Sequence, residues 1–206
     1  MDTNTKPNLR DRQQTATREQ ILNVAMEMLT SGAAGSFSHE SIAVAAGMGA
    51  RTVYRHFPDR AELLQALWLR LRDRTDTKFP AREEEIAAFL RSGFRSFDEH
   101  EPLVRAILSS AAGIEVRERG GVEGRAAFAL SLGGLLTGHS ASERARIIAV
   151  FVAIYSAPFW QLLRDRGQLT GPQAGDAGAW LVEVLLNELR RTKKRGIRGR
   201  TNKKNR

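Results

Sequence analysis

The sequence predicts an all-α protein in which a three-helix, helix-turn-helix head precedes a larger helical domain. Apolar residues recur at spacings of three and four along most of the chain, which is the periodicity of amphipathic helices. Strand signals are scarce, because no run alternates apolar and polar residues and no Asn-Gly or Asp-Gly hairpin turn occurs. Residues 38–57 combine a helix, a glycine turn and a second short helix, and the whole chain is expected to form about nine helices.

The composition excludes several kinds of site. The chain has 206 residues, of which 42% are hydrophobic and 27% charged, as in ordinary soluble globular proteins. It contains no cysteine, which rules out disulfides, thiolate nucleophiles and cysteine-based zinc sites and fits a reducing compartment. Neither a metal nor another cofactor is expected.

The positive charge is concentrated at one end of the chain. Residues 190–206 contain ten of the 32 Lys and Arg residues and no acid, so residues 1–189 carry 22 basic and 23 acidic residues. The net charge of +9 therefore belongs to a near-neutral body with a basic tail, and residues 192–206 are expected to be disordered. The tail is either a solvated end or a source of non-specific phosphate contacts.

The sequence predicts no contact with a membrane. Met1–Gln14 is polar and charged, unlike a secretory signal peptide. Ile147–Leu163 lacks charges but is shorter than the ~20 residues of a typical span, so a buried helix is the better interpretation. A cytoplasmic protein is expected.

Capping residues place the helices of the head. Thr17, with Gln20 as a capping-box partner, is expected to begin the first helix, and Ser38, with Ser41, the second. After the turn Gly47-Met48-Gly49, the third helix should run from Ala50 to His56 and bury Val53 and Phe57. Asp59 should cap the fourth helix.

The remaining chain is expected to hold about five longer helices. Apolar stripes and breakers predict helices over about 83–97, 102–112 and 125–137, a helix over 144–166 kinked at Pro158, and a last helix over 176–191. Residues 113–124 are rich in glycine and charge and are expected to be a loop or a frayed helix start. Residues 170–178 are expected to be a loop.

The polar face of the third helix suits DNA. In a helix-turn-helix this helix lies in the major groove, and its N-terminal side chains reach the base edges. Arg51 and Thr52 point outward there, and an arginine can bond bidentately to guanine. Tyr54, Arg55 and His56 suit phosphates, as do the helix starts at Ser38 and near Arg60. The alternatives are a solvated face for the arginines, a core position for Tyr54 and a capping role for His56.

Two stretches resemble the DNA-binding domain of TetR-type transcriptional regulators. They read "REQILNVAMEML" and "SHESIAVAAGMGARTVYRHFPDRAELLQALW", and "TVYRHFPDRAELL" is the most specific part. The resemblance implies a homodimer that binds a palindromic operator in double-stranded DNA, most simply a repressor released by a small molecule. It also implies base contacts by Ala50, Arg51 and Thr52 and backbone contacts by Tyr54, His56 and Arg60. Ser38 stands where the family usually has Thr.

The same resemblance implies an effector-binding and dimerisation domain. The expected organisation is a flexible N-terminal arm (1–15), the helix-turn-helix domain (16–60), the effector and dimer domain (61–191) and the tail, with dimerisation through the last two helices. A mostly apolar effector is expected, because few charges fall in the aromatic stripes. The candidate effector residues are Phe94, Phe128, Tyr155, Phe159, Trp160 and Gln161. The alternative for each is plain core.

No catalytic set is present, so an enzyme is not expected. His39 and His56 lie in the head, and His100 and His139 have no paired carboxylate or third ligand at metal spacing. One rival is a helical small-molecule-binding protein or enzyme with a non-functional DNA-binding head. Another is a general DNA-coating protein that acts through its basic tail.

Overall fold

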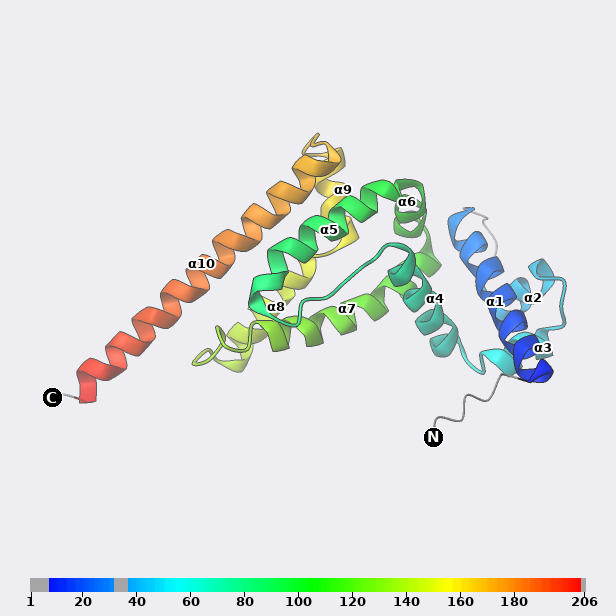
Figure 1. Cartoon of the computed structure of the whole chain (residues 1–206), viewed down its shortest axis with the longest axis horizontal. Helices are drawn as coiled ribbons and strands as arrows, with labels where there is room; N and C mark the ends of the chain where they lie inside the picture. The colour runs from blue at the N-terminus through cyan, green and yellow to red at the C-terminus, as the bar shows by residue number, and fades with distance from the viewer. Residues whose placement is uncertain (1–7, 32–36, 205–206) are drawn as a thin grey trace. The chain divides into compact units, whose positions relative to one another are not determined.

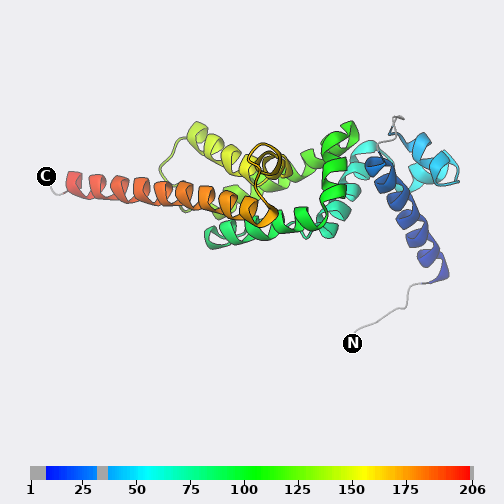
Figure 2. The same cartoon turned by 90° about the horizontal axis from the view of Figure 1, so that it is seen from above.

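The computed structural model describes residues 8–31 and 37–204, with side chains described through Lys194, and this part of the chain contains helices without strands (Figures 1 and 2). Ten α-helices are present in the described residues where about nine were predicted, and the all-α prediction is confirmed. The elements are α1 (Leu9–Thr30), α2 (His39–Ala45), α3 (Ala50–His56), α4 (Arg60–Arg74), the 3-10 helix η1 (Glu83–Glu85), α5 (Ile86–Glu99), α6 (Glu101–Ser109), α7 (Ala111–Ser131), α8 (Ala141–Ile154), α9 (Ala157–Asp165) and α10 (Gly171–Lys204).

The chain forms two compact units. The head unit comprises Met1–Leu71 together with Arg105–Arg117, and the body unit comprises Arg72–Val104 together with Glu118–Arg206. The head unit is thus larger than the domain 16–60 expected from the sequence, because it takes in most of α4 and a distant segment from α6 and α7.

The head unit has its own apolar core. Helix α1 packs against α2, and α2 packs against α3. The side chains of this core are almost completely shielded from solvent: Ile21, Ala25, Leu29, Ile42, Val53, Phe57, Leu63 and Leu67. Removing so many apolar side chains from water is the main favourable term for folding this unit.

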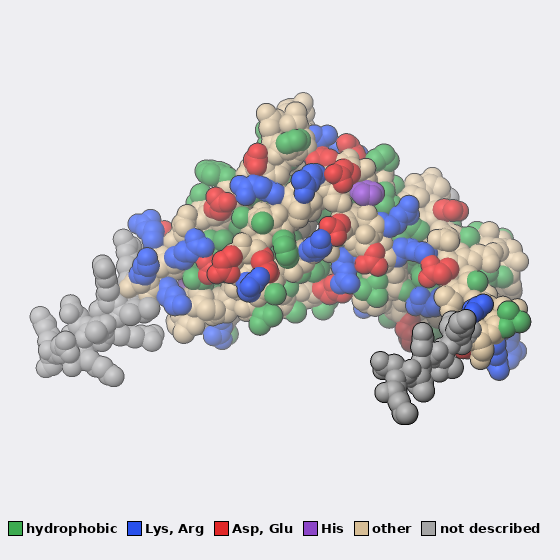
Figure 3. Space-filling view, in the orientation of Figure 1, with side chains coloured by type: hydrophobic (Ala, Val, Ile, Leu, Met, Phe, Trp, Pro, Cys, Tyr) green, Lys and Arg blue, Asp and Glu red, His purple; other side chains and the backbone are tan. Residues whose placement is uncertain are grey.

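The body unit is organised around the packing of α10 on α5. Gly178 of α10 allows a close approach, since a Cβ atom there would lie 2.7 Å from Cδ2 of Leu90. At the edge of this contact Arg91 pairs with Asp176 at 3.1 Å. Figure 3 shows basic and acidic side chains intermixed along α10 and α5. Apolar contact therefore holds α5 and α10 together, and ion pairs between the two helices are exposed at its edge.

The prediction that the first helix begins at Thr17 is wrong. Helix α1 begins at Leu9, and the side chain of Asn8 caps it by accepting from the Asp11 amide at 2.9 Å. The Thr17 hydroxyl instead donates to the Gln13 carbonyl. Residues 9–15 are therefore helical rather than a flexible arm, because Asn is a strong N-cap and no helix breaker follows it.

The predicted loop over residues 113–124 is also wrong, because these residues lie inside α7. Gly124 faces the ring of Phe79, and a Cβ atom there would lie 3.2 Å from the ring. The glycine therefore serves close packing rather than a turn, and tertiary contact outweighs its cost of about 1 kcal/mol in a helix.

The helix expected over 144–166 is two helices, α8 and α9, which meet at a bend of 56°. Ser156 caps α9 by accepting from the Phe159 amide, and Pro158 lies in the first turn, where its missing N–H costs nothing. Among the described residues no single helix is long and apolar enough to cross a membrane, and only this bent pair passes such a test jointly.

Helix α10 differs from the prediction at both ends. It begins at Gly171, so most of the loop expected over 170–178 is helical, with Ala174 and Ala179 fully buried. It continues to Lys204, so the disorder expected for 192–206 is wrong for residues 192–204. Lysine and arginine are good helix formers, and the Thr192 hydroxyl donates to the Glu188 carbonyl where the tail begins.

Replacing Leu90 by alanine should lower the free energy of unfolding by about 2–5 kcal/mol, because its side chain is 1% exposed and fills the contact with α10. Leu130→Ala is the matched control, since Leu130 is 71% exposed and should change stability by less than about 0.5 kcal/mol. Urea unfolding measures both. Equal effects would mean that Leu90 does not hold the helices together.

Candidate functional site

The turn of the helix-turn-helix motif is closed by its backbone. Gly47 has a φ of +65°, a left-handed conformation that favours glycine. The amides of Gly47 and Met48 donate to the carbonyls of Val44 and Ala43, which is the Schellman pattern at the end of a helix. At the start of α2 the predicted capping box of Ser38 and Ser41 is present, with amide-to-hydroxyl distances of 3.1 and 2.9 Å. The sequence thus specifies both ends of α2.

Two buried side chains hold α3 in place, as predicted. Val53 and Phe57 are both 0% exposed. The Phe57 carbonyl accepts a hydrogen bond from Nε2 of the buried His39 at 2.9 Å. The guanidinium of Arg18 on α1 lies 4.6 Å from the centre of the Phe57 ring. One residue of α1 and one of α2 therefore both contact Phe57, the C-cap residue of α3.

Tyr54 belongs to a small network that the sequence did not reveal. Its ring stacks on His39 with centroids 4.5 Å apart and planes 3° apart. Its hydroxyl donates to Glu40 at 2.8 Å, a bond that lowers the pKa of Glu40 and raises that of Tyr54. Tyr54 is nevertheless 42% exposed, so it is a surface residue held in one orientation rather than a core residue. Glu40 and Tyr54 are fourteen positions apart in the sequence, and no local pattern pairs them.

The outer face of α3 carries unpaired positive charge. Arg51 and Arg55 are exposed, and neither has a hydrogen bond or ion pair with another described residue. Ala50 and Thr52 are half-buried at the start of the helix. The pKa of His56 is lowered, first by burial and then by Arg55 and Arg18, so its ring is neutral at physiological pH. The helix thus presents two free guanidiniums one turn apart.

Arg60 has an intramolecular role that the sequence did not suggest. Its guanidinium bonds bidentately to Glu115 of α7 at 2.7 and 2.8 Å and donates to the Phe37 carbonyl at 2.6 Å. The same pairing lowers the pKa of Glu115. Since 55 residues separate the partners, no short-range signal could have shown the pair. The geometry favours a structural role for Arg60 over the phosphate contact expected from the sequence.

The six candidate effector residues do not form one group. Phe94, Phe159 and Trp160 belong to what we call the Trp160 cluster, which also contains Phe97. The indole of Trp160 is fully buried, and its N–H donates to Asp98 at 3.1 Å. These features are those of a satisfied core. Gln161 is half-buried and belongs to neither aromatic group of the described body unit.

Phe128 and Tyr155 lie in a second group, the Tyr155 cluster, with Phe79 and Phe151. The ring of Tyr155 is 5.1 Å from Phe128 and 6.4 Å from Phe79, and Phe128 is 5.7 Å from Phe151. The Tyr155 hydroxyl is buried and has no hydrogen-bond partner among the described residues. Burial, with a smaller contribution from Glu85, raises the pKa of Tyr155 far above its ordinary value. A neutral buried hydroxyl without a partner is costly and uncommon.

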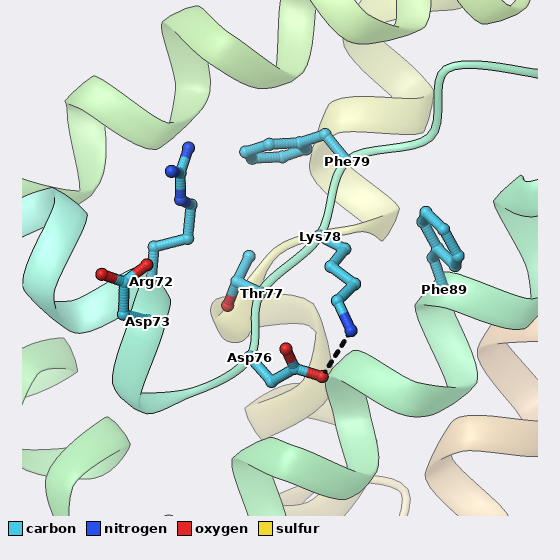
Figure 4. A pocket seen from close by; sticks show the side chains of 7 residues that line it. All are labelled: Arg72, Asp73, Asp76, Thr77, Lys78, Phe79 and Phe89. Carbon is cyan, nitrogen blue, oxygen red and sulfur yellow. Dashed lines mark hydrogen bonds and ion pairs between the residues drawn. The ribbon is translucent and has the colours of Figure 1, made fainter. Parts of the chain in front are cut away.

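A cavity of about 530 Å³ adjoins this cluster, and Phe79 forms part of both. Figure 4 shows the segment from Asp76 to Phe79 between the end of α4 and Phe89 of α5. Lys78 pairs with Asp76 at 2.8 Å, and Arg72 bonds to Glu123 at 3.0 Å. The lining residues are Arg72, Asp73, Asp76, Thr77, Lys78, Phe79 and Phe89. The cavity is thus mixed in character, and none of the six predicted effector residues lines it.

No group of three or more His, Asp or Glu side chains in the described residues is placed to hold a metal ion.

The comparisons with known proteins agree with this geometry. Residues 21–67 match the family described as "Bacterial regulatory proteins, tetR family". These residues include the C-terminal part of α1, all of α2 and α3 and the first half of α4, so the match covers the helix-turn-helix and its supports. No curated protein sequence matches the chain.

Two solved structures share the fold over most of their length. A tetR-family transcriptional regulator from Streptomyces coelicolor is 18% identical, with a TM-score of 0.53 over 85% of this chain and 82% of that one. NalD, the secondary repressor of the MexAB-OprM multidrug efflux pump in Pseudomonas aeruginosa, is 21% identical, with a TM-score of 0.52 over 87% of this chain and 96% of that one. At 18% and 21% sequence identity, the structural similarity to these two proteins establishes the fold.

Glu115→Gln should destabilise the protein at neutral pH by no more than about 1 kcal/mol, because both partners of the pair with Arg60 are about two-fifths exposed (40% and 41%). The pKa of Glu115 is depressed in the folded state, so its contribution is present above its ordinary pKa of 4.5 and is lost as the pH falls through the lower folded value. Urea unfolding at neutral and acidic pH should therefore show a difference from wild type that shrinks in acid.

Glu118→Gln, three residues along the same helix, serves as the control for the loss of one charge. A difference for Glu115→Gln that stays constant with pH would argue against a stabilising ion pair.

Proposed function

Because the chain belongs to the TetR family of bacterial transcriptional regulators, and is therefore a DNA-binding transcription factor rather than an enzyme, we propose that it is a homodimeric repressor released by a small molecule. The observation that carries the proposal is the exposed guanidinium of Arg51 on a short helix anchored by Val53 and Phe57. NalD, which shares the fold, is itself a repressor. We place its action in the cytoplasm, where the bacterial chromosome lies.

In this proposal α3 enters the major groove of the operator. Arg51 would bond bidentately to a guanine, while Ala50 and Thr52 would pack against neighbouring base edges. Arg55, His56 and Tyr54 would contact the backbone, with Tyr54 held in position by His39 and Glu40. Ser38 would offer the start of α2 to another phosphate.

Dimerisation is assigned to α8 and α10. Trp180 and Val184 lie one turn apart on α10 and are 65% and 45% exposed, and Val150 on α8 is 42% exposed. Apolar side chains of this size are costly to leave in water, and a second copy of the same helices would cover them. Sedimentation at micromolar concentration tests this assignment, and a monomer would contradict it.

The effector is assigned to the Tyr155 cluster. Aromatic rings supply the apolar surface, and the Tyr155 hydroxyl supplies one hydrogen bond to a polar atom of the ligand. The adjoining cavity of about 530 Å³ offers a path from solvent, with Phe79 between the two. Phe94, Phe159 and Trp160 of the Trp160 cluster are assigned to the core of the body unit.

Selection from a random duplex library at physiological salt should enrich an inverted repeat. Arg51→Ala should alter the preferred base at one position of each half-site and cost about 1–3 kcal/mol of binding per bidentate contact. Arg55→Ala is the control, because it removes the same charge one turn further along and should weaken binding to all sequences alike. An unaltered preference with Arg51→Ala would exclude it as a base contact, and no enriched motif would refute sequence-specific regulation.

Tyr155→Phe should leave DNA affinity unchanged and leave stability equal or higher, because it removes a buried hydroxyl without a partner. It should weaken the response to an effector by about tenfold, the value of one hydrogen bond. Thermal-shift screening of apolar aromatic compounds, followed by DNA release assays on both proteins, measures these effects. A loss of stability with an unchanged effector response would make Tyr155 a structural residue.

A further inference from the structure

A second cavity lies entirely within the head unit, between α1 and α3. Its volume is about 590 Å³, and its lining residues are Arg10, Gln13, Gln14, Ala16, Thr17, Gln20, Arg55 and His56. Six of the eight come from α1, and the other two are the last residues of α3. All of those on α1 precede residue 21, where the family match begins. We call this cavity the α1–α3 groove.

The residues from α1 form a single helix face. Arg10, Gln13, Gln14, Thr17 and Gln20 are spaced by three or four residues, the spacing that places side chains on one side of a helix. Directly after these residues, the same side of α1 buries Ile21 and Ala25 in the core of the head. In the first turns of α1, the side of the helix that later faces the core therefore carries polar side chains, and these line the groove together with the end of α3.

The chemistry of the groove is that of an anion site. Its walls contain two guanidiniums, three amides and a hydroxyl, and no carboxylate. Neither Arg10 nor Arg55 has a hydrogen bond or ion pair with another described residue. The buried Nε2 atom of His56 has no hydrogen-bond partner among the described residues, although the great majority of buried polar atoms in proteins have one. Unpaired donors that face a hollow without acids favour a phosphate oxygen as the occupant.

The position of the groove identifies the source of the phosphate. Arg55 lies one helical turn after Arg51 on the same exposed face of α3, so the groove continues the surface that would read the bases. A helix in the major groove is flanked by the sugar-phosphate backbone, which contributes most protein–DNA hydrogen bonds. Resting on the proposed DNA-binding function, we propose that the α1–α3 groove binds a backbone phosphate next to each half-site, with Arg10 and Arg55 as its cationic ligands.

The chain provides a matched pair of variants to test the groove. Arg10 lines it, whereas Arg12 lies about 200° further round the same helix and does not. Both side chains are exposed, and alanine is the best helix former, so Arg10→Ala and Arg12→Ala should fold alike. Affinity for a mixed-sequence duplex and for the duplex enriched by selection is measured for both across a salt series.

Arg10→Ala should weaken binding to both duplexes by the same factor, about three- to tenfold at physiological salt. It should also reduce the slope of log K against log salt by about 1 for each protomer bound. Arg12→Ala should change the slope by less than half as much. Methylphosphonate substitution at single positions should locate one phosphate per half-site whose neutralisation weakens the wild type and not Arg10→Ala.

Equal effects of the two variants would mean diffuse attraction without a groove site. A changed base preference with Arg10→Ala would mean a base contact, and a lost effector response with unchanged DNA binding would mean an effector site. Each of these results would overturn the proposal. Failure of the proposed regulatory function would give a different result, because the wild-type protein would then enrich no sequence in the selection. The affinities of the two variants for the mixed-sequence duplex would still test the groove.

Discussion

The burial of Phe57 is the interaction on which the head depends. Its side chain is 0% exposed, its backbone carbonyl accepts from His39, and the Arg18 guanidinium lies over its ring. One residue at the end of α3 thus fixes that helix to both α1 and α2. A helix of seven residues is too short to be stable by itself in water. The direction in which Arg51 and Arg55 point is therefore decided by contacts on the opposite face.

The parts of the fold that could be predicted are those specified by residues close together in the sequence. The bounds of α3, the capping box at Ser38 and the cap at Asp59 were all predicted and are confirmed, because a cap and its partner lie three residues apart. Gly124 was misread as a loop residue, because its role depends on Phe79, which lies far away in the sequence. Glycine indicates a turn only where no distant side chain requires the space.

The candidate sites also differ in whether they depend on residues close together or far apart in the sequence. The exposed face of α3 follows from helical spacing alone, and the sequence was sufficient to predict that Arg51 points outward. The separation of six aromatic candidates into a satisfied cluster and one with an orphaned hydroxyl depends on which helices meet. That the Trp160 indole donates to Asp98 while the Tyr155 hydroxyl has no described partner is decided by tertiary packing. Two buried aromatic side chains that each carry one polar atom therefore differ in whether that atom has a hydrogen-bond partner among the described residues.

The discontinuous composition of the head unit has a consequence for synthesis of the protein. The unit is completed by residues 105–117, and Glu115 accepts two hydrogen bonds from one edge of the Arg60 guanidinium. A ribosome adds residues in order, so the helix-turn-helix emerges well before its last structural partner does. During that interval Arg60 lacks the carboxylate that accepts from it in the complete chain. The nascent head is thus complete only once residues 105–117 have been added, and a fragment ending at residue 71 would lack them.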